Sequence, residues 1–287
     1  MEKDILTLIS GEEPGFSKGK KQISEYILKN YDKAAFMTAG KLGRTVGVSE
    51  STVVRFAAEL GYDGYPGMRK ALQEIIRSRL TSVQRIEVSN ELIDSSNLLP
   101  AVLRSDMERM QATLNEIVKK DFDEATDVIL NSANVYIVGM RSSFCLANFM
   151  WFYLNLIREN VRLIHDTSTS EIYEQIFRIK SDDVCVGISY PRYSVRTVKA
   201  MEFAKTTGAT VIGITDSKIS PLVDIADISL YAKSDMVAFL DSLTAPLSLI
   251  NALVAAVGVR AKDSLFDTFK QLEAIWAENE VYEKNFG

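Results

Sequence analysis

The sequence is poor in the residues that build disulfides and metal centres. Its 287 residues include 2 cysteines, Cys145 and Cys185, and 1 histidine, His165. Both cysteines lie inside apolar segments, which predicts small core residues rather than a disulfide framework and favours a reducing, cytoplasmic compartment. Two distant cysteines and one histidine cannot complete a tetrahedral zinc shell. We therefore expect no bound metal and no other cofactor.

Long hydrophobic runs are also scarce. The first ten residues, MEKDILTLIS, begin with charged residues and lack the apolar stretch of a signal peptide. The most apolar region, residues 239–259, carries Asp241, Pro246 and Asn251 and follows a series of predicted strands. A buried core or subunit-interface helix explains this region better than a membrane span, so no membrane partner is expected.

An excess of positive charge is absent from the chain as a whole, which has a formal net charge of −5. The charges are unevenly distributed, however. Residues 1–80 hold 13 Lys and Arg against 10 Asp and Glu, whereas the remainder holds 20 against 28. A mildly basic head on an acidic body is consistent with a DNA-binding module joined to a second function.

The pattern of apolar residues changes near Asn134. Residues 1–80 have helical periodicity, residues 81–97 are polar and aperiodic, and residues 98–118 are again helical in pattern. Five runs rich in Val and Ile then alternate with helical segments, which indicates a parallel sheet with right-handed crossovers. The predicted fold is α plus α/β: an all-α domain over 1–80, a linker and connecting helix over 81–120, and a doubly wound five-stranded domain over 121–287. The predicted strands are 135–139, 161–165, 183–189, 210–216 and 228–232.

Residues 42–56, LGRTVGVSESTVVRF, meet the requirements of a helix-turn-helix. Gly43 supplies the small residue needed where two helices cross, and Gly47 supplies a turn with positive φ. Ser49 is a suitable N-cap for the second helix. The apolar residues expected to lock the two helices together are Leu42, Val46, Val48, Val53 and Phe56.

The outer face of the second helix is polar, as a DNA recognition helix requires. The hydroxyls of Ser51 and Thr52 can bond phosphates or base edges, and Arg55 can bind a guanine or a phosphate. A helical hairpin that packs against protein would present a more apolar face, so DNA binding is the preferred interpretation. The predicted DNA-binding residues are Ser49, Glu50, Ser51, Thr52 and Arg55.

Residues 49–72, SESTVVRFAAELGYDGYPGMRKAL, resemble the signature of the RpiR family of transcription regulators. The shared features are the S-x-x-T-V-x-R-F run and the L-G-[FY]-x-G-[FY] continuation. The C-terminal half resembles the sugar isomerase (SIS) domain that these regulators carry. The resemblance implies a DNA-binding head joined to a domain that senses a phosphorylated sugar.

Two predicted strands of the C-terminal half end in hydroxyl-rich loops that lead into helices. A glycine followed by serines at a helix N-terminus suits an anion, because free N–H groups and the helix dipole favour phosphate, although serine also caps helices for structural reasons alone. In a sheet of order 2-1-3-4-5, the loops after strands 1 and 3 border the switch point where ligands bind. The predicted ligand-binding residues are Gly139, Arg141, Ser142, Ser143, Ser189, Arg192, Ser194, Arg196 and Thr197.

The second loop departs from the pattern that the resemblance implies. Similar SIS domains usually show S-x-S-G-x-T-x-E-T; here Pro191 and Arg192 stand at its second Ser and its Gly, and Arg196 stands where Glu is common. The added arginines predict either a ligand more anionic than a simple hexose monophosphate or a loop that no longer binds sugar phosphates. Hydroxyls of the pattern are kept at Ser189, Ser194 and Thr197.

Other polar residues near the strand ends have simpler interpretations. Asp216, Ser220 and Pro221 follow the fourth strand and are expected to shape a turn rather than to contact ligand. His165 beside Asp166 would suit a general base, but no partnered nucleophile is evident, so a structural or peripheral role is favoured.

The leading hypothesis is a transcription regulator of carbohydrate genes, not an enzyme, whose binding to double-stranded operator DNA responds to a phosphorylated sugar or sugar acid. The alternative is a sugar-phosphate isomerase, which needs a base over the sugar's C1–C2 region, usually a carboxylate, and no loop marks one clearly. A single recognition helix reads only a few base pairs, so we expect a homodimer or a dimer of dimers. The C-terminal domain and its apolar helix over 240–260 are expected to hold this assembly.

Overall fold

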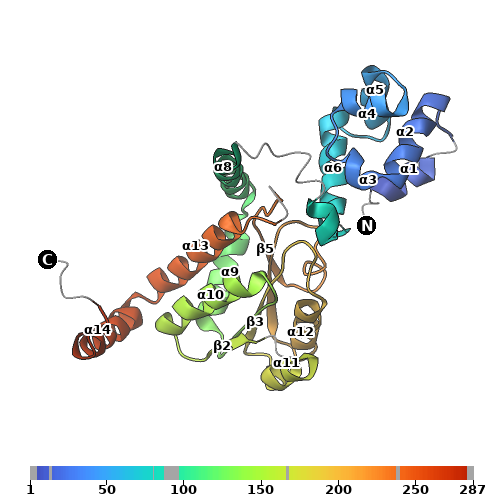
Figure 1. The fold of residues 1–287 in the computed structure, drawn as a ribbon. Helices are drawn as coiled ribbons and strands as arrows, with labels where there is room; N and C mark the ends of the chain where they lie inside the picture. The colour runs from blue at the N-terminus through green and yellow to red at the C-terminus, as the bar shows by residue number, and fades with distance from the viewer. Residues whose placement is uncertain are drawn as a thin grey trace. The chain divides into compact units, whose positions relative to one another are not determined.

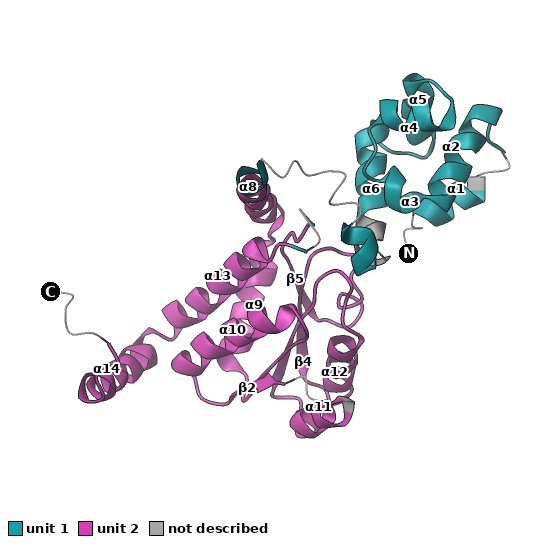
Figure 2. Cartoon of the chain, viewed as in Figure 1, with its two compact units in different colours: residues 1–101, 236–241 teal, residues 102–235, 242–287 magenta. Residues whose placement is uncertain are grey.

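The computed structural model describes residues 5–12, 15–79, 81–86, 97–165, 168–236 and 240–282. The chain forms two compact units, one of residues 1–101 with 236–241 and the other of residues 102–235 with 242–287 (Figure 2). Helices make up the N-terminal part and a parallel sheet with helices makes up the C-terminal part, which confirms the predicted fold class. The sequence had indicated a connecting segment over 81–120, whereas the boundary between the units falls inside one helix, after residue 101.

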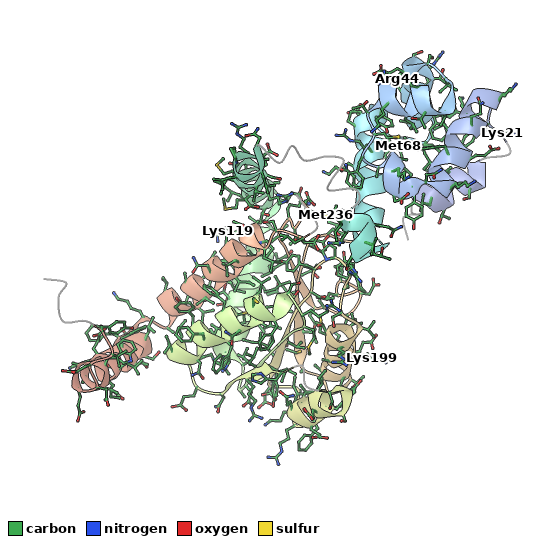
Figure 3. All side chains as sticks on the ribbon, in the orientation of Figure 1. Lys21, Arg44, Met68, Lys119, Lys199 and Met236 are labelled. Carbon is green, nitrogen blue, oxygen red and sulfur yellow. The ribbon has the colours of Figure 1, made fainter. Side chains whose placement is uncertain are left out.

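The N-terminal unit packs its helices around a core of its own (Figure 1). The ring of Phe16 lies edge-on to that of Phe56, with centroids 5.2 Å apart. Met236, from the segment 236–241 that belongs to this unit, packs against the same core (Figure 3). The helices are α1 (Ile5–Glu12), α2 (Lys18–Lys29), α3 (Tyr31–Ala34), α4 (Ala39–Val46), α5 (Glu50–Glu59) and α6 (Gly64–Arg79).

The C-terminal unit is built on a five-stranded sheet of order β2-β1-β3-β4-β5 in which every pair of neighbours is parallel. This order is the doubly wound arrangement predicted from the sequence. All five residues of β1 and of β3 are buried, as expected for strands that helices cover on both faces. The strands are β1 (Val135–Gly139), β2 (Val161–Ile164), β3 (Val184–Ile188), β4 (Thr210–Thr215) and β5 (Ile228–Tyr231).

Helices cover the two faces of this sheet with two separate cores (Figure 1). On one face lie α9 (Lys119–Asn131), α10 (Ser143–Ile157) and α13 (Thr244–Arg260). On the other lie α11 (Thr169–Ile176) and α12 (Val195–Thr206). The remaining helices are α8 (Leu98–Glu116) and α14 (Lys262–Glu278). α10 follows β1 on one face of the sheet and α12 follows β3 on the other, so the chain changes face between these two adjacent strands. The carboxyl ends of β1 and β3, which we call the β1/β3 edge, are therefore the switch point of the sheet.

The structure corrects two sequence-based expectations. Cys145 is exposed on α10 rather than buried in the core, because its position on the helix points away from the sheet. Residues 82–86, assigned to the linker, are helical, and Arg85 is buried and pairs with Asp241 at 2.7 Å. Residues 87–96 of the predicted linker lie outside the described residues.

Cys185 does lie in the core, where burial raises the pKa of its thiol to about 12. Among the described helices none alone is both long and apolar enough to cross a membrane; α13 and α14 meet that test only as a pair, and they are bent by 97° at their junction.

Candidate DNA-binding surface and ligand site

The turn between α4 and α5 depends on two glycines. Gly47 ends α4 in the left-handed conformation, with φ of 79°. At Gly43, a Cβ atom would lie 2.8 Å from the carbonyl oxygen of Val48, which is closer than real Cβ contacts come. The two helices can therefore cross only because position 43 has no side chain, as the sequence predicted.

The apolar contacts between the two helices also follow the prediction. Leu42, Val53 and Phe56 are fully buried, and Val46 and Val48 are partly buried against the same core. The hydroxyl oxygen of Ser49 accepts a hydrogen bond from the backbone N–H of Thr52 at 3.3 Å, which is the expected N-cap of α5.

The predicted DNA-binding residues cluster at the start of α5. Ser49, Glu50, Ser51 and Arg55 are exposed and Thr52 is partly exposed. The guanidinium Nε of Arg55 donates to the carbonyl oxygen of Ser51 at 3.2 Å, so its side chain lies along the outer face of the helix. The Oε2 atom of Glu50 lies 3.0 Å from where a Cβ on Gly40 would be, so this carboxylate leans toward α4. Contact of these residues with DNA stays a prediction.

Sequence reasoning missed a group of lysines beside this surface. A Cβ on Gly19 would lie 3.7 Å from the Cγ2 atom of Thr52, so the start of α2 adjoins the start of α5. Lys18 and Lys21 are exposed there, and Lys20 pairs with Glu59. The run K-G-K-K at residues 18–21 was the signal that could have identified them. Figure 3 labels Lys21 and, on α4, the exposed Arg44.

In the C-terminal unit, the two predicted ligand loops leave the sheet from adjacent strands. Gly139 at the end of β1 pairs in register with Ile188 at the end of β3, so both loops begin at the same edge. A Cβ on Gly139 would lie 2.8 Å from the carbonyl oxygen of Ser143 and 3.0 Å from the Cβ of Ala147. This glycine is therefore needed for the close approach of α10 to β1.

The first loop exposes a cation and a hydroxyl. Arg141 has a left-handed backbone, with φ of 56°, and both Arg141 and Ser142 are exposed, whereas Ser143 is buried. The N–H groups of Ser143 and Phe144 donate to the carbonyl oxygens of Met140 and Arg141, each at 3.1 Å. Because these two amides are already bonded, Ser142 and the Arg141 side chain are the better candidates to hold an anion. The Ser142 hydroxyl makes no capping bond to α10.

The second loop is held by its own hydroxyls. The Ser189 hydroxyl accepts from the backbone N–H of Ser194 at 3.0 Å, and the Ser194 hydroxyl caps α12 by accepting from the N–H of Thr197 at 3.4 Å. Arg192 has φ of 66° and is exposed, as is Arg196. The structural role that serines often have at helix starts is thus present here.

Residues at the end of β4 complete this loop, and sequence reasoning did not assign them to the site. The hydroxyl of Tyr193 donates to Oδ1 of Asp216 at 2.9 Å, and that of Thr215 donates to the carbonyl oxygen of Ser189 at 2.8 Å. Ser220 bonds Thr215 and accepts from the N–H of Leu222, which is the turn-shaping role expected of it. Asp216 is itself buried, so it anchors the loop.

Two further groups near this edge are buried. The Thr197 hydroxyl and the Tyr190 hydroxyl have no hydrogen-bond partner within the described part of the chain. Burial, with the nearby charge of Asp216, raises the pKa of Tyr190 well above its ordinary value, so this phenol stays neutral. Both hydroxyls adjoin the Ser189–Ser194 loop in sequence and remain able to accept a partner.

His165 is exposed and is held through its backbone, so the structural or peripheral role favoured from the sequence stays a prediction. Its backbone is bonded to the side chain of Gln175 through both its N–H, at 2.8 Å, and its carbonyl, at 3.1 Å. Its ring lies 5.7 Å from that of Phe144. Asp166 lies outside the described residues. The described residues contain no group of three His, Cys, Asp or Glu that could hold a metal ion.

Both the helix-turn-helix head and the C-terminal sheet domain match known protein families. Residues 3–79 match the family model of the helix-turn-helix domain of the rpiR family, and residues 128–256 match that of the SIS domain. An uncharacterized HTH-type transcriptional regulator of Haemophilus influenzae is 24% identical over 227 residues, which are 78% of each chain. Another, from Caldanaerobacter subterraneus, is 23% identical and covers 94% of this chain and 95% of its own.

The chain belongs to the RpiR family of transcriptional regulators.

Solved structures place this RpiR-family chain beside proteins of the same architecture. The sugar isomerase domain of an RpiR transcription factor from Sphaerobacter thermophilus is 27% identical, with a TM-score of 0.59, and covers 62% of this chain and 99% of its own. The Vibrio vulnificus NanR protein complexed with ManNAc-6P shares the fold with 22% identity and a TM-score of 0.56, covering 94% of this chain and 98% of its own.

Membership of this family favours the regulator over the isomerase alternative, because the homologous chains are named as regulators. The hydrogen bonds of Asp216 and the arginine at position 196 also favour the regulator. Asp216, a carboxylate beside the second loop, is bonded to Tyr193 and lies 3.3 Å from the hydroxyl of Thr215. Arg196 stands where the family pattern often has an acid.

Proposed function

We propose that this RpiR-family regulator binds double-stranded operator DNA through the start of α5, and that a phosphorylated sugar or sugar acid at the β1/β3 edge changes that binding. The head supports the first part. Its exposed hydroxyls and Arg55 lie on a capped helix that packs closely against α4. Exposed Lys18 and Lys21 adjoin this surface and suit the phosphate contacts that position a protein on DNA.

One observation carries the ligand part of the proposal: Arg141 and Arg192, on the two loops, both have positive φ. A left-handed backbone costs an L-residue other than Gly about 1–2 kcal/mol, and such strain concentrates at functional sites. Arg192 stands where the family pattern has Gly, so the backbone shape of the loop is kept while a cation is added. A charge-assisted contact to a bound anion would account for that cost.

The chemistry of the loops narrows the ligand class. Three arginines, Arg141, Arg192 and Arg196, flank the hydroxyls at this edge, and all three are exposed. NanR, which shares the fold, is complexed with ManNAc-6P, a phosphorylated sugar. We infer that the ligand here carries a carboxylate or a second phosphate in addition to one phosphate, because Arg192 and Arg196 stand where the family pattern has a glycine and an acid and so make the loop more cationic.

A ligand screen tests this part. Thermal unfolding of the full chain is measured with phosphorylated sugars, phosphorylated sugar acids, the unphosphorylated acids and inorganic phosphate. At about 100 times its Kd, a true ligand should stabilise the unit that binds it by roughly 2.7 kcal/mol. The phosphorylated sugar acids should shift the melting temperature most, and no shift with any phosphorylated carbohydrate would refute the ligand assignment.

Operator binding also needs more than one head. A single recognition helix reads a few base pairs, so we infer that this regulator acts in the cytoplasm as a homodimer or a dimer of dimers. Half-sites should then be separated by about one turn of DNA, roughly 34–36 Å, or a multiple of it. Light scattering at micromolar concentration tests this, and a monomeric mass would contradict it.

A further inference from the structure

The apolar side chains of α14 are largely exposed. None of its 17 residues is buried, although it carries large apolar side chains, of which Phe266 is 69% exposed and Ile275 is 52% exposed. Isolated helices of about this length are marginal in water, and most helical stability in proteins comes from packing an apolar face. The contacts that α14 makes within its own unit therefore leave its apolar surface largely uncovered.

A large groove lies at the foot of this helix. It has a volume of about 890 Å³ and is lined by α10, α13 and α14. We call it the elbow groove, after the 97° bend between α13 and α14. Its apolar lining comes from all three helices and includes Tyr153, Leu156, Val254, Val259, Phe266 and Phe269.

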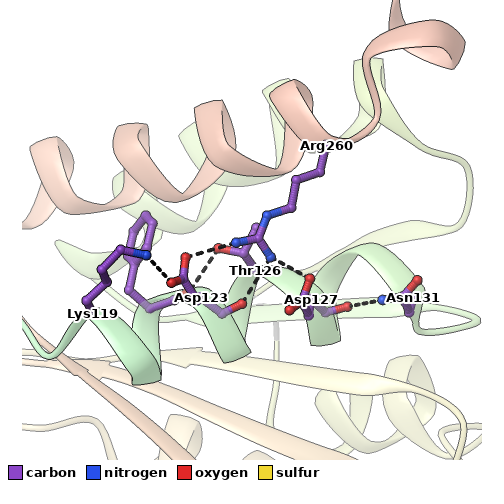
Figure 4. A network of polar contacts seen from close by, with 7 residues as sticks. Lys119, Asp123, Thr126, Asp127, Asn131 and Arg260 are labelled. Carbon is purple, nitrogen blue, oxygen red and sulfur yellow. Dashed lines mark hydrogen bonds and ion pairs between the residues drawn. The ribbon is translucent and has the colours of Figure 1, made fainter.

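The base of the groove is anchored to the rest of the unit. Arg260, the last residue of α13, donates to Oδ1 of Asp123 at 2.9 Å and pairs with Asp127, both on α9 (Figure 4). Lys119 also bonds Asp123, and these contacts lower the pKa of that carboxyl. The junction between α13 and α14 is therefore held against α9, which fixes this side of the groove.

The helix that the sequence analysis assigned to the assembly, residues 240–260, serves mainly as core. Most of the apolar side chains of α13, among them Leu249, Ile250 and Leu253, are buried inside its own unit. One of its exceptions, Val259, is 76% exposed and lies in the elbow groove. The uncovered apolar surface thus continues from the end of α13 onto α14.

We propose that the elbow groove and α14 form an interface with the same surface of a second copy of this chain. In such a two-fold contact, the α14 of each copy covers the apolar lining of the other's groove. At 1.5 Å per residue, the 17 residues of α14 extend over about 25 Å, so the helix presents several turns to a partner. This interface rests on the self-association proposed above and specifies the surface that mediates it.

The charges at the groove suit a second copy of the same chain. The charged residues among its lining are Lys262, Asp263 and Asp267, all on α14. A surface with both signs is self-complementary, since Lys262 of one copy can pair with an acid of the other, and each such pair occurs twice under two-fold symmetry. A pocket for a small anionic ligand would instead bring polar groups together within an apolar cavity.

Light scattering on the full-length protein at micromolar concentration tests the proposal. Phe266→Glu should halve the mass of the assembly, because it places a charge in the apolar contact, and Val259→Glu should do the same from the α13 side. Phe177→Glu is the matched control: Phe177 is 59% exposed at the end of α11, away from the groove lining, and its variant should keep the wild-type mass. Circular dichroism checks that each variant is folded.

Cross-linking provides an independent readout that does not disrupt the contact. In a Cys145→Ser background, Phe266→Cys should give covalent dimers with a short bis-maleimide, and Phe177→Cys should not. A wild-type assembly whose mass survives both glutamate substitutions, or equal cross-linking at positions 266 and 177, overturns the proposed surface while leaving self-association intact. A monomeric wild-type protein overturns both.

Discussion

Arg141 and Arg192 hold the same left-handed backbone conformation, with φ of 56° and 66°, on loops that follow the neighbouring strands β1 and β3. Each loop leads into a helix, and the two helices lie on opposite faces of the sheet. Two strained cations therefore flank the switch point of a doubly wound sheet, where ligands bind in this architecture. This relationship is the basis for the predictions about the ligand.

Replacing Arg192 by Gly should distinguish the cost of its positive φ from the contribution of its guanidinium to ligand binding. Arg192→Gly removes the cost of positive φ, so the ligand-free protein should be as stable as wild type or up to about 1 kcal/mol more stable. Loss of the guanidinium should weaken binding of the phosphorylated sugar acid by about tenfold or more, since hydrogen bonds to charged groups contribute about 1.5–3 kcal/mol. Thermal unfolding with and without ligand measures both effects.

Lys199→Gly is the control for this substitution, because Lys199 is exposed inside α12. A helical glycine costs about 0.8–1.0 kcal/mol relative to Ala, so this variant should lose stability and keep ligand affinity. An Arg192→Gly variant that loses as much stability as Lys199→Gly would show that position 192 is not strained.

The serines of the two loops should differ in what they contribute. Ser142 makes no capping bond, so Ser142→Ala should weaken ligand binding and leave the stability of the ligand-free protein within about 0.5 kcal/mol of wild type. Ser189 accepts the N–H of Ser194, so Ser189→Ala should also cost about 1 kcal/mol of stability. Calorimetry and denaturant unfolding measure these effects separately. Unchanged ligand affinity in a variant that carries both Ser142→Ala and Ser189→Ala would contradict the pocket assignment.

Gly43 should be intolerant of any side chain. Gly43→Ala places a Cβ 2.8 Å from the carbonyl oxygen of Val48, so the head should lose about 1–3 kcal/mol of stability and its DNA binding should weaken accordingly. Gly67→Ala is the matched control: it lies inside α6, where the nearest atom to a new Cβ is 3.8 Å away, and it should gain about 0.5–1 kcal/mol. Equal stabilities of the two variants would mean that the α4–α5 crossing is looser than described.

The two cysteines should react very differently with thiol reagents. Cys145 is exposed, whereas burial raises the pKa of Cys185 to about 12. At pH 7–9 the native protein should therefore be modified once, at Cys145, and twice only when unfolded. The raised folded-state pKa also implies that stability is fully present below the unfolded thiol pKa of about 8.5 and falls as pH rises from there toward 12. Rapid labelling of two thiols in the native protein would contradict this assignment.

Much of the fold was predictable because its signals are local. The Gly43 and Gly47 spacing indicated the helix-turn-helix, and the Val- and Ile-rich runs indicated buried parallel strands in the observed order. Contacts between distant residues were not predictable in this way. The placement of Lys18 and Lys21 beside α5, the bond from Tyr193 to Asp216 and the exposure of Cys145 depend on how elements pack.

The same distinction applies to the apolar helices near the C-terminus. Hydropathy identified residues 240–260 as apolar, but composition does not distinguish a helix that is buried in its own unit from one that another chain covers. Only the packing shows that α13 fills the core and that α14 does not. The positive φ of Arg192 was likewise invisible in the sequence, except through a glycine in the family pattern.

The central claim is that ligand at the β1/β3 edge changes DNA binding by α5, and one measurement tests it most directly. Operator fragments selected from random DNA by the wild-type protein are titrated by fluorescence anisotropy at fixed salt, with and without the stabilising sugar-acid phosphate, for wild type, Arg55→Ala and Ser142→Ala. Wild type should change its operator affinity when ligand is added, and Ser142→Ala should bind the same DNA without that response. Arg55→Ala should lose about 1–3 kcal/mol of operator binding while keeping its ligand affinity. Unchanged operator binding by Arg55→Ala, or a wild-type affinity that ligand does not alter, would contradict the account.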